Sequence, residues 1–175
     1  MEIQRSGDLK HYARLIEESE TIQMKIQELT IYTQRLEEQT NFYSKVLRLD
    51  IITKTNTSVS FQIGKSILKL ISREYFTPYH YAINIPSNQE GEALKWLEER
   101  VDILKYNNLK IQYFDFWNAY AIYFYDADKN IVELIAKKNL ENNSKKPFNK
   151  NSLLEISEIG IPTFDIRKEY KVLNE

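Results

Sequence analysis

The sequence predicts an α+β protein in which a strand, a helix and three further strands follow one another twice. Two observations lead to this prediction. Short segments alternate between apolar and polar residues, as half-buried strands do, whereas other segments repeat apolar residues at helical spacing. These segments come in the same order in residues 24–73 and in residues 78–137. We therefore expect one domain over 24–137 that consists of two βαβββ units.

The first unit should begin with a strand, continue with a helix and end in three short strands. The expected elements are a strand at 26–33, a helix over roughly 35–47 with Phe42, Tyr43, Val46 and Leu47 on its buried side, and strands near 50–54, 59–63 and 66–72. A turn-like sequence at 56–58 separates the first two of these short strands.

The second unit repeats this order. The expected elements are a strand at 79–85, a helix with Ala93, Trp96, Leu97 and Val101 on one face, and strands near 110–114, 119–125 and 131–136. Ser87 and Glu90 have the spacing of a capping box, in which each side chain bonds the backbone of the other residue. We therefore expect the helix of this unit to begin there.

Two further segments lie outside these units. Residues 1–23 form an N-terminal extension, in which apolar spacing at 8–20 predicts a short amphipathic helix. The Asn- and Lys-rich residues 138–152 have the composition of a linker.

The C-terminal segment 153–175 contains an internal echo. Residues 156–163 match residues 26–33, with Ile, Glu, Ile and Thr shared in register. The segment therefore resembles the start of a second, incomplete domain. Because a lone strand leaves both of its edges unpaired, we expect it to pair with another chain or to pack on residues 24–137, and we expect the protein to be a homodimer in solution.

Composition narrows the function classes. The 175 residues include 24 basic and 25 acidic side chains, so no net positive field attracts nucleic acid or an anionic membrane. No apolar run is long enough to cross a bilayer, and the first 23 residues lack the apolar core of a signal peptide. We therefore expect a cytoplasmic protein with no nucleic-acid or membrane partner. Since there is no cysteine, a metal would have to be held by carboxylates and by the two histidines, His11 and His80.

A carboxylate within an apolar strand is the most informative single feature. Residues 123–136 form two apolar strands joined by a tight polar turn, and Glu133 lies in the second strand. Because side chains alternate along a strand, Glu133 shares a face with Ile131 and Ile135. A carboxylate in such a place is costly unless a cation, a metal or hydrogen-bond donors meet it. Glu133 is therefore the first candidate for a functional residue.

The pattern at 123–136, together with the doubled βαβββ order, resembles the vicinal oxygen chelate superfamily of glyoxalases, bleomycin-resistance proteins and extradiol dioxygenases. The resemblance covers about residues 24–137. It implies a curved, half-barrel mixed sheet with helices on its outer face and a cavity on its inner face. It also implies a small-molecule ligand or substrate, and a Glu at the position of Glu133 is commonly a metal ligand in this superfamily.

Sorting the strands by face directs Glu28, His80 and Glu133 into the expected cavity. These positions match the metal triad of the superfamily, which in extradiol dioxygenases is two His and one Glu, and Glu28 stands where a His is usual. The resemblance therefore implies a divalent metal, Mn, Fe, Ni or Zn, held by His80, Glu133 and Glu28. Glu133 is also the residue to which we assign a catalytic role.

A metal-free arrangement is equally open. Lys69 lies on the fourth strand and could form an ion pair with Glu28 or Glu133, so that its ammonium takes the place of a metal. The other expected pocket residues are Tyr32, Asn84 and Trp117, the last from an aromatic cluster at 113–125.

Two functions follow from these alternatives. The first is a glyoxalase/dioxygenase-like enzyme that uses a divalent metal to chelate vicinal oxygens of a small molecule. The second is a metal-free protein that binds or sequesters a small aromatic compound, as bleomycin-resistance proteins do. A third interpretation is an accessory chain whose role is assembly. Metal content separates the first two functions, and the oligomeric state bears on the third.

Overall fold

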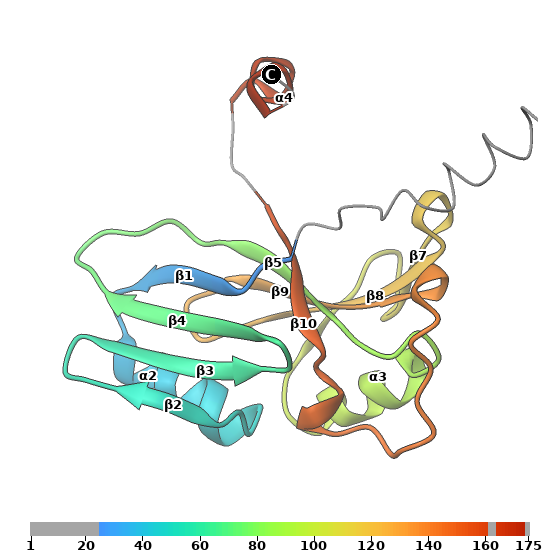
Figure 1. Cartoon of the computed structure of the whole chain (residues 1–175), viewed down its shortest axis with the longest axis horizontal. Helices are drawn as coiled ribbons and strands as arrows, with labels where there is room; N and C mark the ends of the chain where they lie inside the picture. Colours follow the sequence, from blue (N-terminus) through green and yellow to red (C-terminus); the bar gives the residue numbers. More distant parts are fainter. Residues whose placement is uncertain (1–24, 161–163, 174–175) are drawn as a thin grey trace, which may run out of the picture.

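The structure is a computed structural model that describes residues 25–160 and 164–173 (Figure 1). The helix expected at 8–20 lies outside the described residues. None of the helices in the described ranges has both the length and the apolar character that crossing a membrane requires.

The first unit forms a four-stranded sheet with one helix. Its elements are β1 (Glu28–Thr33), α2 (Leu36–Asn41), a π-helical turn (Phe42–Val46), β2 (Ile51–Lys54), β3 (Ser58–Ile63) and β4 (Ser66–Ser72). The strand order is β1-β4-β3-β2, with β1 parallel to β4 and the other pairs antiparallel. The helix after β1 belongs to the long connection that a parallel pair of strands requires.

The second unit repeats this plan. Its elements are β5 (His80–Asn84), α3 (Glu90–Glu98), β6 (Ile103–Leu104), β7 (Gln112–Phe114), β8 (Ala119–Tyr125) and β9 (Ile131–Lys137). Here β5 is parallel to β9, and β9 is antiparallel to β8. The predicted α+β class and the doubled βαβββ order are confirmed. The sequence did not predict β6, which has two residues.

The strand of the C-terminal segment joins the second sheet. It forms β10 (Glu155–Ile159), which pairs antiparallel with β5, so the six-stranded sheet has the order β10-β5-β9-β8-β6 with β7 on β8. In Figure 1 this strand lies in the middle of the molecule, at the edge of its sheet that is nearer to the four-stranded sheet. Of the two arrangements expected for this strand, the structure shows packing on residues 24–137. The homodimer stays a prediction.

One buried apolar cluster joins the two units. It includes Ile31 and Leu70 of the first sheet, Val132 of the second sheet, Tyr43 after α2 and Leu97 of α3. The helix α2 packs on β3 and β4, whereas α3 packs on β8 and β9. Each sheet therefore buries one face under its helix, and α3 leaves the opposite face of the second sheet uncovered.

A buried polar network fixes the turn between β8 and β9 against the first unit. The Asp126 carboxylate accepts hydrogen bonds from Gln39 Nε2 (2.9 Å), Tyr43 Oη (2.8 Å) and Asn130 Nδ2 (2.7 Å). Burial raises the pKa of Asp126, and these hydrogen bonds oppose the rise because they favour the charged carboxylate. On the same turn, Asp128 accepts from Arg35 Nε at 2.9 Å. The turn that precedes Glu133 is therefore held in one place.

The start of α3 differs from the prediction. Its N-cap residue is Gln89, without a side-chain cap, so the capping box expected between Ser87 and Glu90 is wrong. The Ser87 hydroxyl instead donates to Asn143 Oδ1 (2.8 Å), and the Ser87 amide donates to Asn142 Oδ1 (2.8 Å). The segment 138–152, expected as a linker, therefore lies along the start of α3 and supplies the partners that a capping box would have used.

Candidate functional site

Neighbouring strands of the second sheet align their residues in rows that run across the face opposite α3. In one row, His80 on β5 lies opposite Ile131 on β9, which lies opposite Tyr125 on β8. At the edge of this row, the Gly160 amide after β10 donates to the His80 carbonyl at 2.7 Å. The side chains of a row point to the same face because the pleats of paired strands are in phase.

The next row carries the acidic residues. Glu158 on β10 lies opposite Ala82, Ala82 lies opposite Glu133, and Glu133 lies opposite Tyr123. Ala82 is small and buried, so no large side chain lies between the two carboxylates in this row. The sequence thus folds so that two adjacent rows on one face bring together an imidazole, a phenol and two carboxylates.

His80 and Glu133 meet between these rows. His80 Nε2 lies 3.0 Å from Glu133 Oε2, and the Glu133 residue is 3% exposed, whereas the His80 side chain is 43% exposed. The hydrogen bond to Glu133 raises the pKa of His80; burial opposes the rise, and the charges of Glu133 and Glu158 add to it. The imidazole is thus the partner that makes a carboxylate tolerable within this apolar strand.

Tyr123 and Lys137 complete the surroundings of the pair. Burial, followed by the negative charge of Glu133, raises the pKa of Tyr123, so its hydroxyl stays protonated. On the other side, Lys137 Nζ lies 2.6 Å from Glu158 Oε1. Glu158 is therefore already paired with a cation, and its charge still reaches His80.

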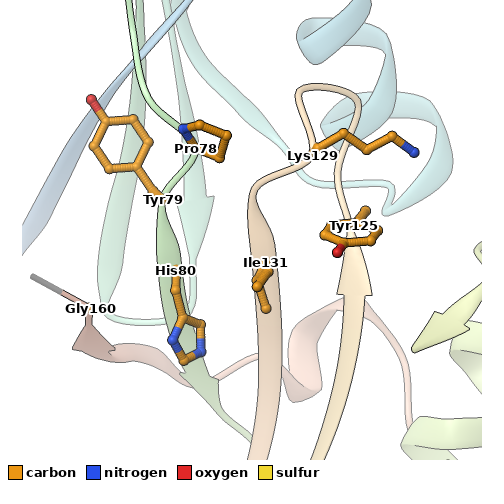
Figure 2. Close-up of a pocket in the computed structure, with 7 residues that line it drawn as sticks. All are labelled: Pro78, Tyr79, His80, Tyr125, Lys129, Ile131 and Gly160. Atoms are coloured by element: carbon orange, nitrogen blue, oxygen red, sulfur yellow. The ribbon is translucent and has the colours of Figure 1, made fainter. Parts of the chain in front are cut away.

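A cavity of about 600 Å³ opens beside His80. Figure 2 shows His80 and Ile131 on neighbouring strands, with Tyr125 on the next strand and Lys129 on the turn near it. The lining residues are Pro78, Tyr79, His80, Tyr125, Lys129, Ile131 and Gly160. The cavity thus combines apolar and aromatic walls with one imidazole and one ammonium group, which is a common composition for small-molecule sites.

Glu28 and Lys69 lie elsewhere. Glu28 is exposed on β1, where its carboxylate accepts from Thr30 Oγ1 at 3.2 Å. Lys69 on β4 lies opposite Thr30, and the ion pairs between described residues include none from Lys69 to Glu28 or Glu133. The predicted ion pair is therefore wrong. For Glu133 the reason is strand order, because β4 lies in the first sheet whereas Glu133 lies on β9 of the second sheet. Glu28 is on the neighbouring strand β1, where it lies opposite Ile67 and its carboxylate accepts from Thr30.

The other expected pocket residues do not line this cavity. The Tyr32 ring packs under the Arg73 guanidinium, at 4.1 Å from the ring centre. Asn84 is buried and donates to Glu155 Oε1 at 3.3 Å. Trp117 is half-exposed in a 3-10 turn, where its ring packs on Phe114. These side chains have partners of their own away from the His80–Glu133 pair.

Solved structures share this architecture. A lactoylglutathione lyase from Agrobacterium tumefaciens has 20% sequence identity and a TM-score of 0.56, over 65% of this chain and 94% of that chain. The vicinal oxygen chelate fold is therefore the fold of this protein. Its resemblance to this superfamily, predicted from the βαβββ order, is confirmed at the level of the fold.

Two further structures with the vicinal oxygen chelate fold give similar values. A mutant of the fosfomycin resistance protein FosX from Listeria monocytogenes, complexed with Mn(II) and dihydroxypropylphosphonic acid, has 19% identity and a TM-score of 0.51, over 69% of this chain and 95% of that chain. A glyoxalase/bleomycin resistance protein/dioxygenase from Nocardioides has 16% identity and a TM-score of 0.53, over 78% of this chain and 99% of that chain.

Sequence comparisons add little to this. The model of a family of unknown function, DUF6435, matches residues 1–29. No curated protein matches the sequence.

The His80–Glu133 pair fits part of a metal site. Two donors bound at about 2.1 Å to one tetrahedral ion lie about 3.4 Å apart, so the observed 3.0 Å between Nε2 and Oε2 needs little change to admit an ion. Within the described residues, no three His, Asp or Glu side chains are gathered closely enough to hold a metal. In particular, Glu28 is not beside the other two expected ligands. The described chain thus supplies two converging donors.

Sequence reasoning missed several residues at this site. Tyr125 shares a face with Tyr123 by alternation, which could have placed it beside Glu133. The match between residues 156–163 and 26–33 pointed to Glu158, which corresponds to Glu28. It did not predict that β10 pairs with the edge of β5. Lys129 lies in a turn, where no periodic pattern tells which way a side chain points.

Proposed function

We propose that this chain is a small-molecule enzyme of the glyoxalase/dioxygenase type in which His80 and Glu133 hold a divalent metal. The observation that carries the proposal is the 3.0 Å approach of His80 Nε2 to Glu133 Oε2 beside the cavity. Imidazole and carboxylate together suit Mn²⁺, Fe²⁺, Ni²⁺ or Zn²⁺. The metal-containing FosX structure with the same fold also supports the proposal.

The residues around the pair have distinct roles in this proposal. A bound metal would act as a Lewis acid towards two neighbouring oxygens of the substrate. Glu133 would contribute a carboxylate fixed by its strand, and His80 would contribute a neutral imidazole. The protonated Tyr123 hydroxyl lies in the row of Glu133 and would orient that carboxylate. The apolar side chains of Pro78, Tyr125 and Ile131 would exclude water from the cavity.

A third ligand is part of the proposal, because catalytic metal sites usually have three protein ligands. The resemblance assigns this role to Glu28. Among the described residues, Glu158 is the other carboxylate whose charge acts on His80, and Lys137 already pairs with it. Because Glu28 lies on the first sheet and is not gathered with His80 and Glu133, a change of Glu28 should affect metal affinity less than a change of either of those two residues.

Elemental analysis and titration calorimetry of the full chain test the proposal. We expect about one divalent ion per chain with the wild type, because the His80–Glu133 pair occurs once. His80→Ala and Glu133→Gln should each lower the affinity by at least about tenfold, and Glu28→Gln should have a smaller effect. Glu37→Gln, on the exposed side of α2, is the matched control and should change nothing. Protein that takes up none of the four metals at neutral pH would contradict the proposal.

Metal-free ligand binding is the second candidate. It is favoured by one observation, namely that His80 Nε2 and Glu133 Oε2 lie at hydrogen-bond distance, 3.0 Å apart. In that case the His80–Glu133 pair would have a structural role beside a ligand-binding cavity, as in a protein that sequesters its ligand. The same titration separates the two functions, because a binding protein would accept small ligands in the absence of any metal.

A further inference from the structure

The lining of the cavity beside His80 is unbalanced in charge. Of its lining residues, Lys129 carries a positive charge and none is a carboxylate. Glu133 is buried, and its carboxylate lies within hydrogen-bond distance of His80 Nε2. Lys129 is exposed, and the described parts of the chain offer it no acidic partner in an ion pair. An unpaired ammonium group at a cavity is a binding group for an anion.

The position of Lys129 is fixed by its turn. Its backbone has a φ of 66°, and its amide donates to the Asp126 carbonyl at 3.2 Å. The Asp126 side chain in turn accepts from the amides of Asp128 and Asn130, each at 2.9 Å. The backbone of Lys129 is therefore held by a buried network, and only its side chain is free to adjust.

Lys129 and Tyr125 form one end of the cavity. Lys129 Nζ lies 5.3 Å from the centre of the Tyr125 ring, within the range of a cation–π contact. Tyr125, Ile131 and Pro78 together offer an aromatic and aliphatic surface on the way to His80. Figure 2 shows this order, with Lys129 and Tyr125 on one side and His80 on the β5 side of Ile131.

We propose that this cavity binds a small carboxylate with a flat, apolar body, whose carboxylate pairs with Lys129 and whose opposite end faces His80. A single lysine suits a carboxylate, since groups with higher charge such as phosphate are usually met by several donors. The inference rests on the proposed function for the chemistry at His80, but the pairing at Lys129 needs no metal.

Benzoate and benzamide are suitable probes, because the two molecules have similar shape and differ in charge. Their binding to the full chain is measured by calorimetry or NMR in the presence of EDTA. Benzoate should bind at least about tenfold more tightly than benzamide, because a charge-assisted hydrogen bond is lost in the amide. Higher salt should weaken benzoate binding and leave benzamide binding unchanged.

Variants of Lys129 test whether this residue binds the carboxylate of benzoate. Lys129→Met keeps the length of the side chain and the same backbone strain, so it should lower benzoate affinity by about tenfold and leave benzamide unaffected. Lys129→Arg should keep most of the benzoate affinity, since it keeps the charge. Lys105→Met, an exposed lysine that does not line the cavity, is the matched control and should bind benzoate like the wild type.

Three results would overturn the inference: no benzoate binding at millimolar concentration, equal affinity for the two probes, or equal losses in Lys129→Met and Lys105→Met. Failure of the proposed function is recognised separately. Protein that binds no metal but prefers benzoate through Lys129 would contradict the enzyme and retain the carboxylate site. Protein that binds one metal per chain but does not prefer benzoate to benzamide would retain the proposed enzyme and contradict the carboxylate site.

Discussion

The strands β1 and β10 share a sequence pattern but pair with different strands. Ile26 and Glu28 in the first strand region correspond to Ile156 and Glu158 in the last. However, β1 pairs parallel with β4, whereas β10 pairs antiparallel with β5. Glu28 is exposed, whereas Glu158 pairs with Lys137 and raises the pKa of His80. Of the two corresponding glutamates, only Glu158 therefore acts on His80, because β10 pairs with β5, the strand that carries His80.

The two regions meet at one hydroxyl group. Ser66 Oγ donates to the Ile26 carbonyl at 2.6 Å and accepts from the Ile156 amide at 3.0 Å. The two isoleucines are at corresponding positions of the matching segments, so Ser66 joins the carbonyl of one to the amide of the other. The C-terminal strand is therefore part of the body of the protein and not an appendage to it.

The two isoleucines allow the largest test of this comparison. Ile156 is 1% exposed within the core, whereas Ile26 packs at the border of the core and is partly buried. Ile156→Ala should lower the free energy of unfolding by about 2–5 kcal/mol, because it creates a cavity among rigid neighbours. Ile26→Ala should cost about half as much or less. Urea denaturation of both variants measures the difference, and equal losses would mean that β10 is not integral to the fold.

Ser66 gives a smaller effect. Ser66→Ala removes the shared hydroxyl and leaves a buried amide at Ile156 and a carbonyl at Ile26 without this partner. The free energy of unfolding should fall by about 1–3 kcal/mol. Ser72→Ala, at the exposed end of the same strand, is the control and should cost less than about 0.5 kcal/mol. If Ser66→Ala matched this control, the link between the two regions would contribute nothing to stability.

Local patterns predicted most of the fold. Strand alternation and helical spacing located β1, β3, β4, β5, α3, β8 and β9, because each of these elements has a buried face. The strand β2 is exposed throughout, and the turn-like sequence at 56–58 marked its end. Local patterns missed β6, whose two residues are too few for a period. They also gave a capping box at Ser87 that a distant asparagine segment replaces. A sequence pattern of a few residues predicts hydrogen bonds correctly only where no distant segment competes for the same donors and acceptors.

The site was predictable only where both partners lie in paired strands of the same unit. His80 and Glu133 are on adjacent parallel strands, so face and register sufficed to bring them together. A pair between Lys69 and Glu133 failed because the two residues lie in different sheets, whose arrangement cannot be predicted from alternation. The approach of Glu158 to His80 depended in the same way on the antiparallel placement of β10 beside β5. Strand order between units is decided by packing of the whole core.

The smallest effect concerns the two glutamates and the pH dependence of stability. In metal-free protein, the pKa of His80 is raised above its ordinary value, first by the hydrogen bond to Glu133 and also by the charge of Glu158. A raised pKa means that the pair contributes stability fully below about pH 6.5 and loses it as the pH rises through the pKa in the folded protein. Since the His80 side chain is 43% exposed, this contribution should be within about 1 kcal/mol.

Glu158→Gln should therefore lower the pKa of His80 and move the loss of stability to lower pH, because one of the negative charges that favour imidazolium is gone. Glu28→Gln, the corresponding change in β1, should leave the titration of His80 unchanged, since Glu28 is not among the groups that shift it. An NMR titration with EDTA present, in which His80→Ala identifies the signal of His80 against that of His11, measures both variants. If the two substitutions shifted the His80 titration equally, or if Glu28→Gln shifted it more, the distinction between β1 and β10 at the site would be lost.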